Sequence, residues 1–152
     1  MNETRDPLDG YPIVLTLPVQ WGDQDAFEHV NNTVYLRWCE TARVEYLVRI
    51  GLFERRNAAG IGPIMANITI DYKRPVTYPD SVRVGARVTR IGNSSFHMEH
   101  LVVSEAMNAV AAAMDSVLVV VDYTRNKPVP VPAAVRGAIE QLEGRAFETP
   151  GK

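Results

Sequence analysis

The sequence predicts an α+β fold in which a five-stranded antiparallel sheet wraps around one long central helix. A stretch of about 20 residues that ends at Gly51 contains no other glycine and no proline, which predicts one helix roughly 30 Å long. Segments with alternating apolar and polar residues precede this stretch and follow it in a run. Strands and helices therefore do not alternate, which disfavours a parallel doubly wound sheet and leaves an antiparallel sheet with one helix to bury.

The first strand is expected over Ile13–Trp21, IVLTLPVQW, and Pro18 within it predicts an edge position or a bulge. The helix is expected to begin at Asn31 or Asn32, because an Asn side chain can accept a hydrogen bond from the unpaired N–H groups of the first turn. Gly51 suits the C′ position that ends it. Apolar residues cover more than a narrow stripe of this helix, which predicts neighbours on more than one side.

The segment after the helix, Phe53–Gly62, is polar and contains glycine, which predicts a surface loop. Strands are then expected over Pro63–Arg74, Ser81–Ile91, Phe96–Ser104 and Ala109–Asp122, and turn signals join the last three as a meander. The last strand ends in VLVVVD, which is apolar on both faces. Such a strand is typical of the middle of a sheet, covered on one face by the helix and on the other by a partner subunit.

The remaining segments complete a single domain that spans residues 1–152. Asn126–Pro132, NKPVPVP, predicts a stiff extended linker, and Pro132–Leu142 predicts a short helix that begins with proline. Residues 1–10 and 145–152 are expected to be a mobile leader and a mobile tail.

Composition excludes several classes of function. The net charge of −2, with both signs mixed along the chain, disfavours nucleic acid and an anionic membrane as partners. Cys39 is the only cysteine, so a disulfide framework or a cysteine-based zinc cluster is excluded, and no H-E-x-x-H spacing is present. We therefore expect neither a metal nor another cofactor. The polar N-terminus and the lack of a window of ~20 apolar residues predict a soluble, cytoplasmic protein.

The stretch WGDQDAFEHVNNTVYLRW, residues 21–38, combines two acids, a histidine and two asparagines just ahead of the helix. Its D-x-D-x-x-x-H-V-N-N-x-x-Y pattern resembles the active-site stretch of the hotdog-fold thioesterases, in the 4-hydroxybenzoyl-CoA thioesterase family. The segments DYKRP, VRVGARV and VLVVVD follow in the family's order, so the resemblance extends over roughly residues 15–122. Glu28 departs from the pattern, because close relatives often have glycine before the histidine. The resemblance implies a hotdog fold and hydrolysis of an acyl-CoA or acyl-carrier thioester by a homodimer or a dimer of dimers.

Asp25 is the candidate catalytic group, because an ionised carboxylate can attack a thioester carbonyl or deliver water to it. The family resemblance implies the same role, whereas the alternative is a turn or capping residue. Asp23 would point the same way in an extended segment and is expected to be solvated or structural. His29 could donate to a substrate oxygen or act as a base, although a positioning role is the main expectation. The resemblance also implies an oxyanion donor at the backbone N–H of Asn32, where the helix dipole favours negative charge.

Candidate substrate-binding residues are spread along the chain. Phe27 and Tyr35 could line an acyl pocket, or they could belong to the core. The resemblance implies that Met65 and Asn67 lie near the acyl group, and Asn67 could read a polar substrate group or face solvent.

Phosphates of a CoA moiety would suit Lys73, Arg74 and Arg90, or these residues could be solvated strand ends. Some relatives have a basic cluster where this chain has Gly92-Asn93-Ser94, so the choice between CoA and a carrier protein stays open. Two other functions remain possible on the same fold: a non-catalytic module that binds an acyl thioester or another small ligand, and a dehydratase.

Overall fold

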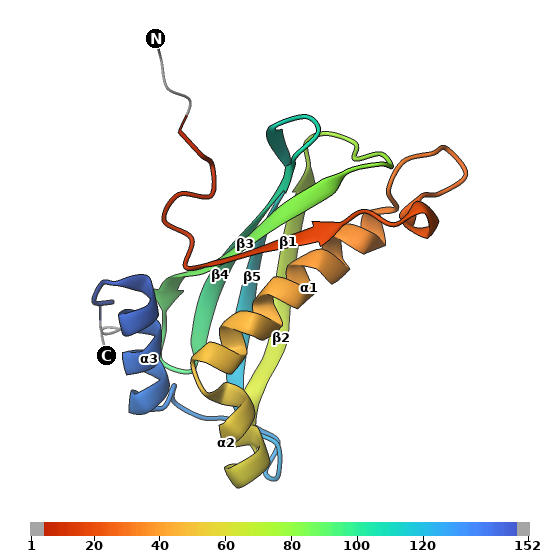
Figure 1. Ribbon diagram of the computed structural model, residues 1–152. Helices are drawn as coiled ribbons and strands as arrows, with labels where there is room; N and C mark the ends of the chain where they lie inside the picture. The colour runs from red at the N-terminus through yellow and green to blue at the C-terminus, as the bar shows by residue number, and fades with distance from the viewer. Residues whose placement is uncertain (1–4, 149–152) are drawn as a thin grey trace.

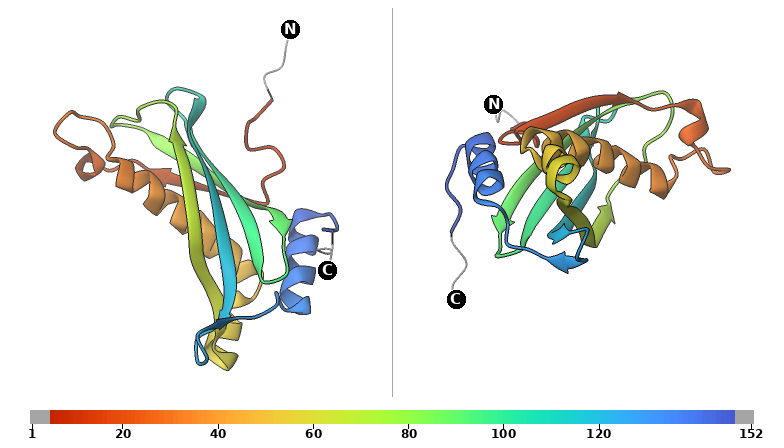
Figure 2. Two further views of the ribbon diagram at one scale, coloured as in Figure 1. Left: turned by 180° about the vertical axis from the view of Figure 1, so that it is seen from behind. Right: turned by 90° about the horizontal axis from the view of Figure 1, so that it is seen from below.

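The computed structural model describes residues 5–148 and confirms one curled antiparallel sheet with a long helix across it (Figure 1). The sheet order is β1-β3-β4-β5-β2, formed by β1 (Ile13–Pro18), β2 (Ile61–Tyr72), β3 (Ser81–Ile91), β4 (Ser95–Ser104) and β5 (Ala109–Asp122). Helix α1 (Asn32–Arg49) packs on β3, β1 and β4, and the strands curl around it in the end-on view (Figure 2). This is the hotdog arrangement.

The core lies between α1 and the inner face of the sheet. In β3 the alternation places Val82, Val84, Ala86 and Val88 inside, all at most 1% exposed, as their spacing predicts. Strands β3, β4 and β5 form the predicted meander, and β1 is an edge strand that ends at Pro18. Each fully buried aliphatic side chain contributes about 1.5–3 kcal/mol by leaving water, so this layer holds the helix in place.

Both ends of α1 lie where the sequence predicts them. The Asn31 side chain caps the first turn by accepting a hydrogen bond from the Thr33 N–H at 3.0 Å. Helix α1 stops at Arg49 because Gly51 follows with a φ of 80°, a left-handed conformation that glycine adopts without steric cost. The N-terminus of α1 is thereby fixed at the edge of the loop that precedes it.

The predicted surface loop after α1 is wrong, because residues Leu52–Ala59 form a second helix, α2. Leu52 is fully buried and anchors the helix to the core. Gly51 and Gly60 bracket it, both in the left-handed region. The polarity of ERRNAA suggested a loop, but Glu, Arg and Ala are also good helix formers, and one buried leucine is sufficient to dock a two-turn helix.

The N-terminal segment packs on the sheet over its described part. Leu8 is 4% exposed, and Asp6 forms an ion pair with Arg83 on β3 at 2.9 Å. The hydrogen bond from Arg83 holds the pKa of Asp6 below its usual value. The sequence did not predict these contacts, because the leader has no apolar periodicity. Residues 1–4 of the expected mobile leader lie outside the described range.

The C-terminal segment also contacts the sheet. The expected linker contains a two-residue strand, β6 (Lys127–Pro128), which pairs with β5. Helix α3 (Ala133–Glu143) follows, and Glu143 accepts hydrogen bonds from the Val88 N–H and the Tyr46 hydroxyl. Residues 149–152 of the expected tail are outside the described range. Within residues 5–148, no helix has both the length and the apolar character needed to cross a membrane.

Candidate active site

The motif residues lie in a tight loop between β1 and α1. A 3₁₀ turn, Trp21–Asp23, starts the loop. The chain then reverses, with a hydrogen bond of 2.8 Å from the Asp25 N–H to the His29 carbonyl and one of 2.9 Å from the Asn31 N–H to the Asp23 carbonyl. Glu28 at the tip has a φ of 64°. This left-handed conformation suits glycine, which gives a physical reason for the glycine that the family pattern often has at this position.

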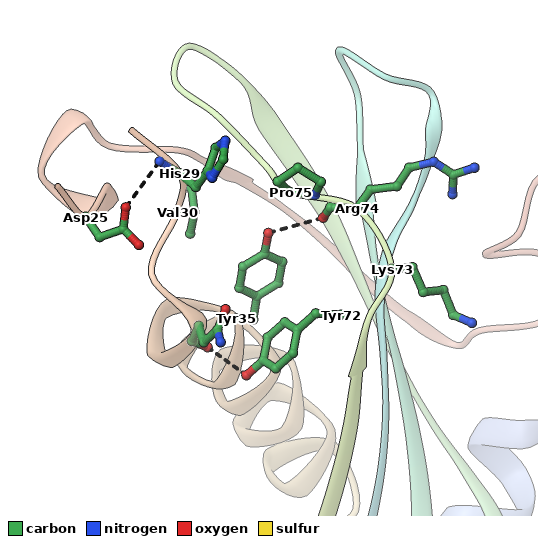
Figure 3. Close-up of a pocket in the computed structure, with 9 residues that line it drawn as sticks. Asp25, His29, Val30, Tyr35, Tyr72, Lys73, Arg74 and Pro75 are labelled. Carbon is green, nitrogen blue, oxygen red and sulfur yellow. Dashed lines mark hydrogen bonds between the residues drawn. The ribbon is translucent and has the colours of Figure 1, made fainter. Parts of the chain in front are cut away.

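Asp25 is exposed, and its carboxylate is aimed by its own loop. One oxygen, Oδ1, accepts a hydrogen bond from the Phe27 N–H at 2.9 Å. The same oxygen accepts one from the His29 N–H at 3.4 Å (Figure 3). The other oxygen, Oδ2, accepts none from residues 5–148. Asp25 is therefore a turn residue through one oxygen, while its second oxygen is not engaged by the described residues. The structural and functional interpretations of this residue are compatible.

Asp23 has a different environment from Asp25, and the expectation that both carboxylates point the same way is wrong. Asp23 lies in the 3₁₀ turn rather than in an extended segment and is 6% exposed. Its Oδ2 accepts a hydrogen bond from the Gln20 N–H at 2.8 Å, and its Oδ1 accepts one from Arg37 on α1 at 2.8 Å. Asp23 is structural, as expected, but it is buried instead of solvated. It joins the start of the loop to α1.

The first turn of α1 offers hydrogen-bond donors to the same loop. Asn32 is the first helical residue, and its N–H has no acceptor among the described residues, as expected for this position. The aligned peptide dipoles of α1 add partial positive charge there. An oxygen atom that gains negative charge would be stabilised at this point.

Tyr35 and Tyr72 connect α1 to the segment after β2. The Tyr35 hydroxyl accepts a hydrogen bond from the Val76 N–H at 3.0 Å, and the Tyr72 hydroxyl donates to the Asn32 carbonyl at 3.1 Å. The two rings meet edge to face at 5.2 Å. Burial raises the pKa of both phenols. Tyr35 is 2% exposed, so it belongs to the core and also closes one end of the site.

These elements surround a cleft of about 300 Å³. Its lining contains Asp25, His29, Val30, Asn32, Tyr35, Tyr72, Lys73, Arg74 and Pro75. The structure therefore brings together the three predicted catalytic residues, Tyr35 and two of the three predicted basic residues. Tyr72, Val30 and Pro75 were not predicted. Tyr72 could have been found, since it continues the alternation of Ile68 and Ile70 on β2.

Lys73 and Arg74 form the wall opposite Asp25. Both side chains extend away from Asp25 (Figure 3). Arg74 donates a hydrogen bond to the Val110 carbonyl at 3.1 Å. Negative charge on the Asp25 side and positive charge on the other would orient a ligand that carries phosphates.

Other predicted site residues lie outside this cleft. Phe27 is 82% exposed and lines a neighbouring surface cleft with Trp21 and Tyr78, so it is neither core nor a wall beside Asp25. Asn67 is exposed on β2. Arg90 is exposed near the C-terminal end of β3, where it pairs with His97 of β4. The opposite end of β3 pairs with Pro18, which leads into the Asp25 loop. Met65 lines a separate groove beside α1.

Residues 5–148 contain neither a candidate metal site nor a reactive thiol. Within residues 5–148, no cluster of three or more His, Cys, Asp or Glu side chains could hold a metal ion. Cys39 is 1% exposed, and burial raises its pKa to about 12. A buried thiol with such a pKa is a poor nucleophile.

Comparisons with known proteins identify the family. A model of the Thioesterase-like superfamily matches residues 19–139. The chain is 26% identical over 118 residues to the long-chain acyl-CoA thioesterase FadM of Escherichia coli, covering 78% of this chain and 89% of FadM. It is 32% identical over 92 residues to THEM6 of Danio rerio, covering 60% of this chain and only 46% of THEM6. A crystal structure of a thioesterase from Thermus thermophilus, complexed with coenzyme A and zinc, superposes with a TM-score of 0.81 at 36% identity, covering 91% of this chain and 99% of that chain. With its fold, its motif and this match over most of its length, the chain belongs to the Thioesterase-like superfamily.

Proposed function

We propose that this protein hydrolyses an acyl-CoA thioester to a free acid and a thiol. The main support is the cleft, which is lined by both Asp25 and the first residue of α1, Asn32. The Oδ2 atom of Asp25 accepts no hydrogen bond from the described residues. The names of the relatives support the substrate class: FadM is a long-chain acyl-CoA thioesterase, and the Thermus enzyme is complexed with coenzyme A. Lys73 and Arg74 are placed to meet the phosphates of CoA.

In this proposal the thioester carbonyl oxygen lies at the Asn32 N–H, and Asp25 approaches the carbonyl carbon. Asp25 either attacks that carbon, which gives a mixed anhydride that water opens, or removes a proton from the attacking water. In both routes one water is consumed, a carbon–oxygen bond forms and the carbon–sulfur bond breaks. The thiolate leaves and takes up a proton. The N–H group and the helix dipole stabilise the oxyanion that precedes this departure.

Asp25→Asn tests the proposal with little change in structure, because the amide oxygen can still accept the Phe27 and His29 N–H bonds. We expect kcat/KM on acyl-CoA substrates to fall by about 10²–10⁴-fold. Asp115→Asn, at an exposed acid on β5, is the matched control and should keep wild-type activity. Equal activity of Asp25→Asn and wild type across a panel of acyl-CoA chain lengths would reject the assignment. Saturable binding without turnover in the wild-type protein would indicate a binding module instead.

The role of Asp25 can be resolved by a single turnover in ¹⁸O-labelled water. If Asp25 attacks and water then opens the anhydride at the enzyme carbonyl, the label enters the aspartate. If Asp25 acts as a base, the label appears only in the acid product. Label in the peptide that contains Asp25, detected by mass spectrometry, would therefore establish covalent attack by this residue.

We also propose that two copies of the chain associate through β2. This strand lies at the edge of the sheet, and seven of its twelve residues are exposed. Ile64 and Ile68 are 43% and 41% exposed. Exposed apolar side chains are unusual on an edge strand, whose outer side has no neighbouring strand to pair with. Light scattering coupled to size-exclusion chromatography should give the mass of two or four chains, and the mass of one chain would contradict this.

The single buried cysteine is consistent with the expected cytoplasmic location.

A further inference from the structure

The cap and the first three residues of α1 leave one backbone donor free. The Asn31 N–H donates to the Asp23 carbonyl at 2.9 Å, and the Val34 N–H donates to the Asn31 carbonyl at 2.9 Å. The Thr33 N–H donates to the Asn31 side chain at 3.0 Å. Of these four N–H groups, only that of Asn32 has no acceptor among the described residues. The position of this single group therefore decides where an oxygen that gains negative charge can be stabilised.

Tyr72 is the last residue of β2, and its side chain reaches this turn from the sheet (Figure 3). Its hydroxyl donates to the Asn32 carbonyl at 3.1 Å. A helical carbonyl also accepts the N–H group four residues further along the helix, and it has lone pairs for both bonds. Tyr72 is 41% exposed, so water can replace this bond when the hydroxyl is removed. The bond is thus not required to satisfy a buried group, and its main effect is to fix the Asn32 end of α1 relative to β2.

The residues that directly follow β2 are the basic pair Lys73 and Arg74. Their two N–H groups donate to the Ala111 carbonyl of β5 at 2.8 and 3.1 Å. On the other side, the Tyr35 hydroxyl of α1 accepts a hydrogen bond from the Val76 N–H at 3.0 Å. The backbone that carries the basic pair is therefore held by β5 and by α1, and a residue that joins β2 to Asn32 also joins this pair to Asn32.

We propose that Tyr72 is a positioning residue, which keeps the oxyanion donor and the basic wall of the cleft at a fixed separation. The inference rests on the proposed thioesterase function, in which Asn32 holds the thioester oxygen while Lys73 and Arg74 meet the phosphates. A flexible arm joins these two parts of a CoA thioester. Binding of the phosphates therefore assists the reaction only when the arm can span the two walls with the carbonyl in place.

This role predicts an effect on one class of substrate. A CoA thioester uses both walls of the cleft, whereas the thioester of the same acyl group with N-acetylcysteamine has no phosphates and uses only the Asn32 wall. The quantity to measure is the ratio of kcat/KM for the two thioesters, the CoA thioester over the small one. A ratio within one preparation does not depend on how much of the protein is folded, so a loss of stability in a variant leaves it unchanged.

Tyr72→Phe should lower this ratio about three- to tenfold relative to the wild-type protein, which is within the range for one neutral hydrogen bond. Tyr123→Phe is the matched control. Tyr123 is 39% exposed, and its hydroxyl also donates to a backbone carbonyl, that of Pro63, but it is not part of the lining of the Asp25 cleft. The ratio should keep its wild-type value in this control.

Lys73→Met tests whether the Tyr72 hydroxyl acts through the basic wall. This variant should also lower the ratio. Tyr72→Phe in the Lys73→Met background should lower the ratio little further, because the two changes remove the same advantage of the CoA thioester. Effects that multiply in the double variant would contradict the inference, since they would show that the two side chains act independently.

Three other results would overturn the inference: a wild-type ratio near one, a ratio that is unchanged in Tyr72→Phe, and an equal loss of kcat/KM on both thioesters in that variant. In each of these cases, hydrolysis that depends on Asp25 would leave the proposed function intact. If the wild-type protein hydrolysed neither thioester, the proposed function and the role of Tyr72 would both be rejected.

Discussion

Asp23→Ala probes what holds the Asp25 loop in place. Asp23 is 6% exposed and accepts two short hydrogen bonds, from the Gln20 N–H and from Arg37, each at 2.8 Å. Alanine removes both acceptors and leaves the Gln20 N–H without its protein partner. The perturbation therefore separates the start of the loop from α1 without touching Asp25.

The two lost contacts differ in energy. A hydrogen bond to a charged group is worth about 1.5–3 kcal/mol, which applies to the Gln20 N–H bond. The Arg37 side chain is 58% exposed, so its ion pair is screened and adds only about 0.5 kcal/mol. We expect Asp23→Ala to lower the free energy of unfolding by about 2 kcal/mol, which corresponds to a drop in Tm of about 4–8 °C for a chain of this size. Arg37→Met should cost only about 0.5 kcal/mol.

Urea unfolding monitored by circular dichroism measures both values. All proteins must be compared at one protein concentration, because subunit association would add to the apparent stability. If Arg37→Met destabilises the protein as much as Asp23→Ala, the exposed ion pair dominates and the reasoning about the Gln20 N–H is refuted.

Three further predictions concern single side chains. Glu28→Gly should raise the free energy of unfolding by up to about 1 kcal/mol, because φ is 64° there and the left-handed region costs a non-glycine residue about 1–2 kcal/mol; a lower urea midpoint would contradict this. Ser116→Ala should leave the free energy of unfolding unchanged or raise it, because the Ser116 hydroxyl has no hydrogen-bond partner within residues 5–148. Ser104→Ala should instead lower the free energy of unfolding by about 1–2 kcal/mol, because the Ser104 hydroxyl donates to Asp80 and accepts from the Met107 N–H. Equal losses in these two serine variants would refute the distinction. His100→Phe should weaken the acid sensitivity of the fold. In the folded protein the pKa of His100 is lowered from 6.5 to about 3, so between these two pH values the unfolded chain binds more protons than the folded one. The stability of the wild-type protein therefore falls as the pH drops from 6.5 to about 3. Melting curves of equal pH dependence in both proteins would argue against it.

The elements that the sequence predicted well are those with strong local signals. The start of α1 was predicted because an Asn cap is a local device, and β3 because alternation over eleven residues permits only one register. Helix α2 was missed because its signal is a single buried leucine in a polar segment. The contacts of Leu8 and Asp6 were missed for a similar reason, since each depends on β3, which lies far away in the sequence.

The candidate site divides in the same way. Asp25, His29 and Asn32 are close in the sequence, so one motif predicts them together. Tyr72, Lys73 and Arg74 reach the same cleft only because β2 ends beside the first turn of α1. The assignment of Arg90 relied on charge alone, and the far end of β3 separates it from this cleft.

The sequence by itself determined the order of the long helix and the five long strands, the caps of that helix, the inner face of β3 and the stretch that contains the candidate carboxylate. These properties follow from periods, turns and side-chain chemistry, which act over a few residues. Only the tertiary structure decided that Asp23 is buried while Asp25 is exposed, because burial depends on Arg37 one turn into the neighbouring helix. It also decided that Tyr72, Lys73 and Arg74 reach the cleft beside Asp25. These residues lie far from the loop in the sequence, and packing of α1 on the sheet brings the end of β2 to the first turn of the helix.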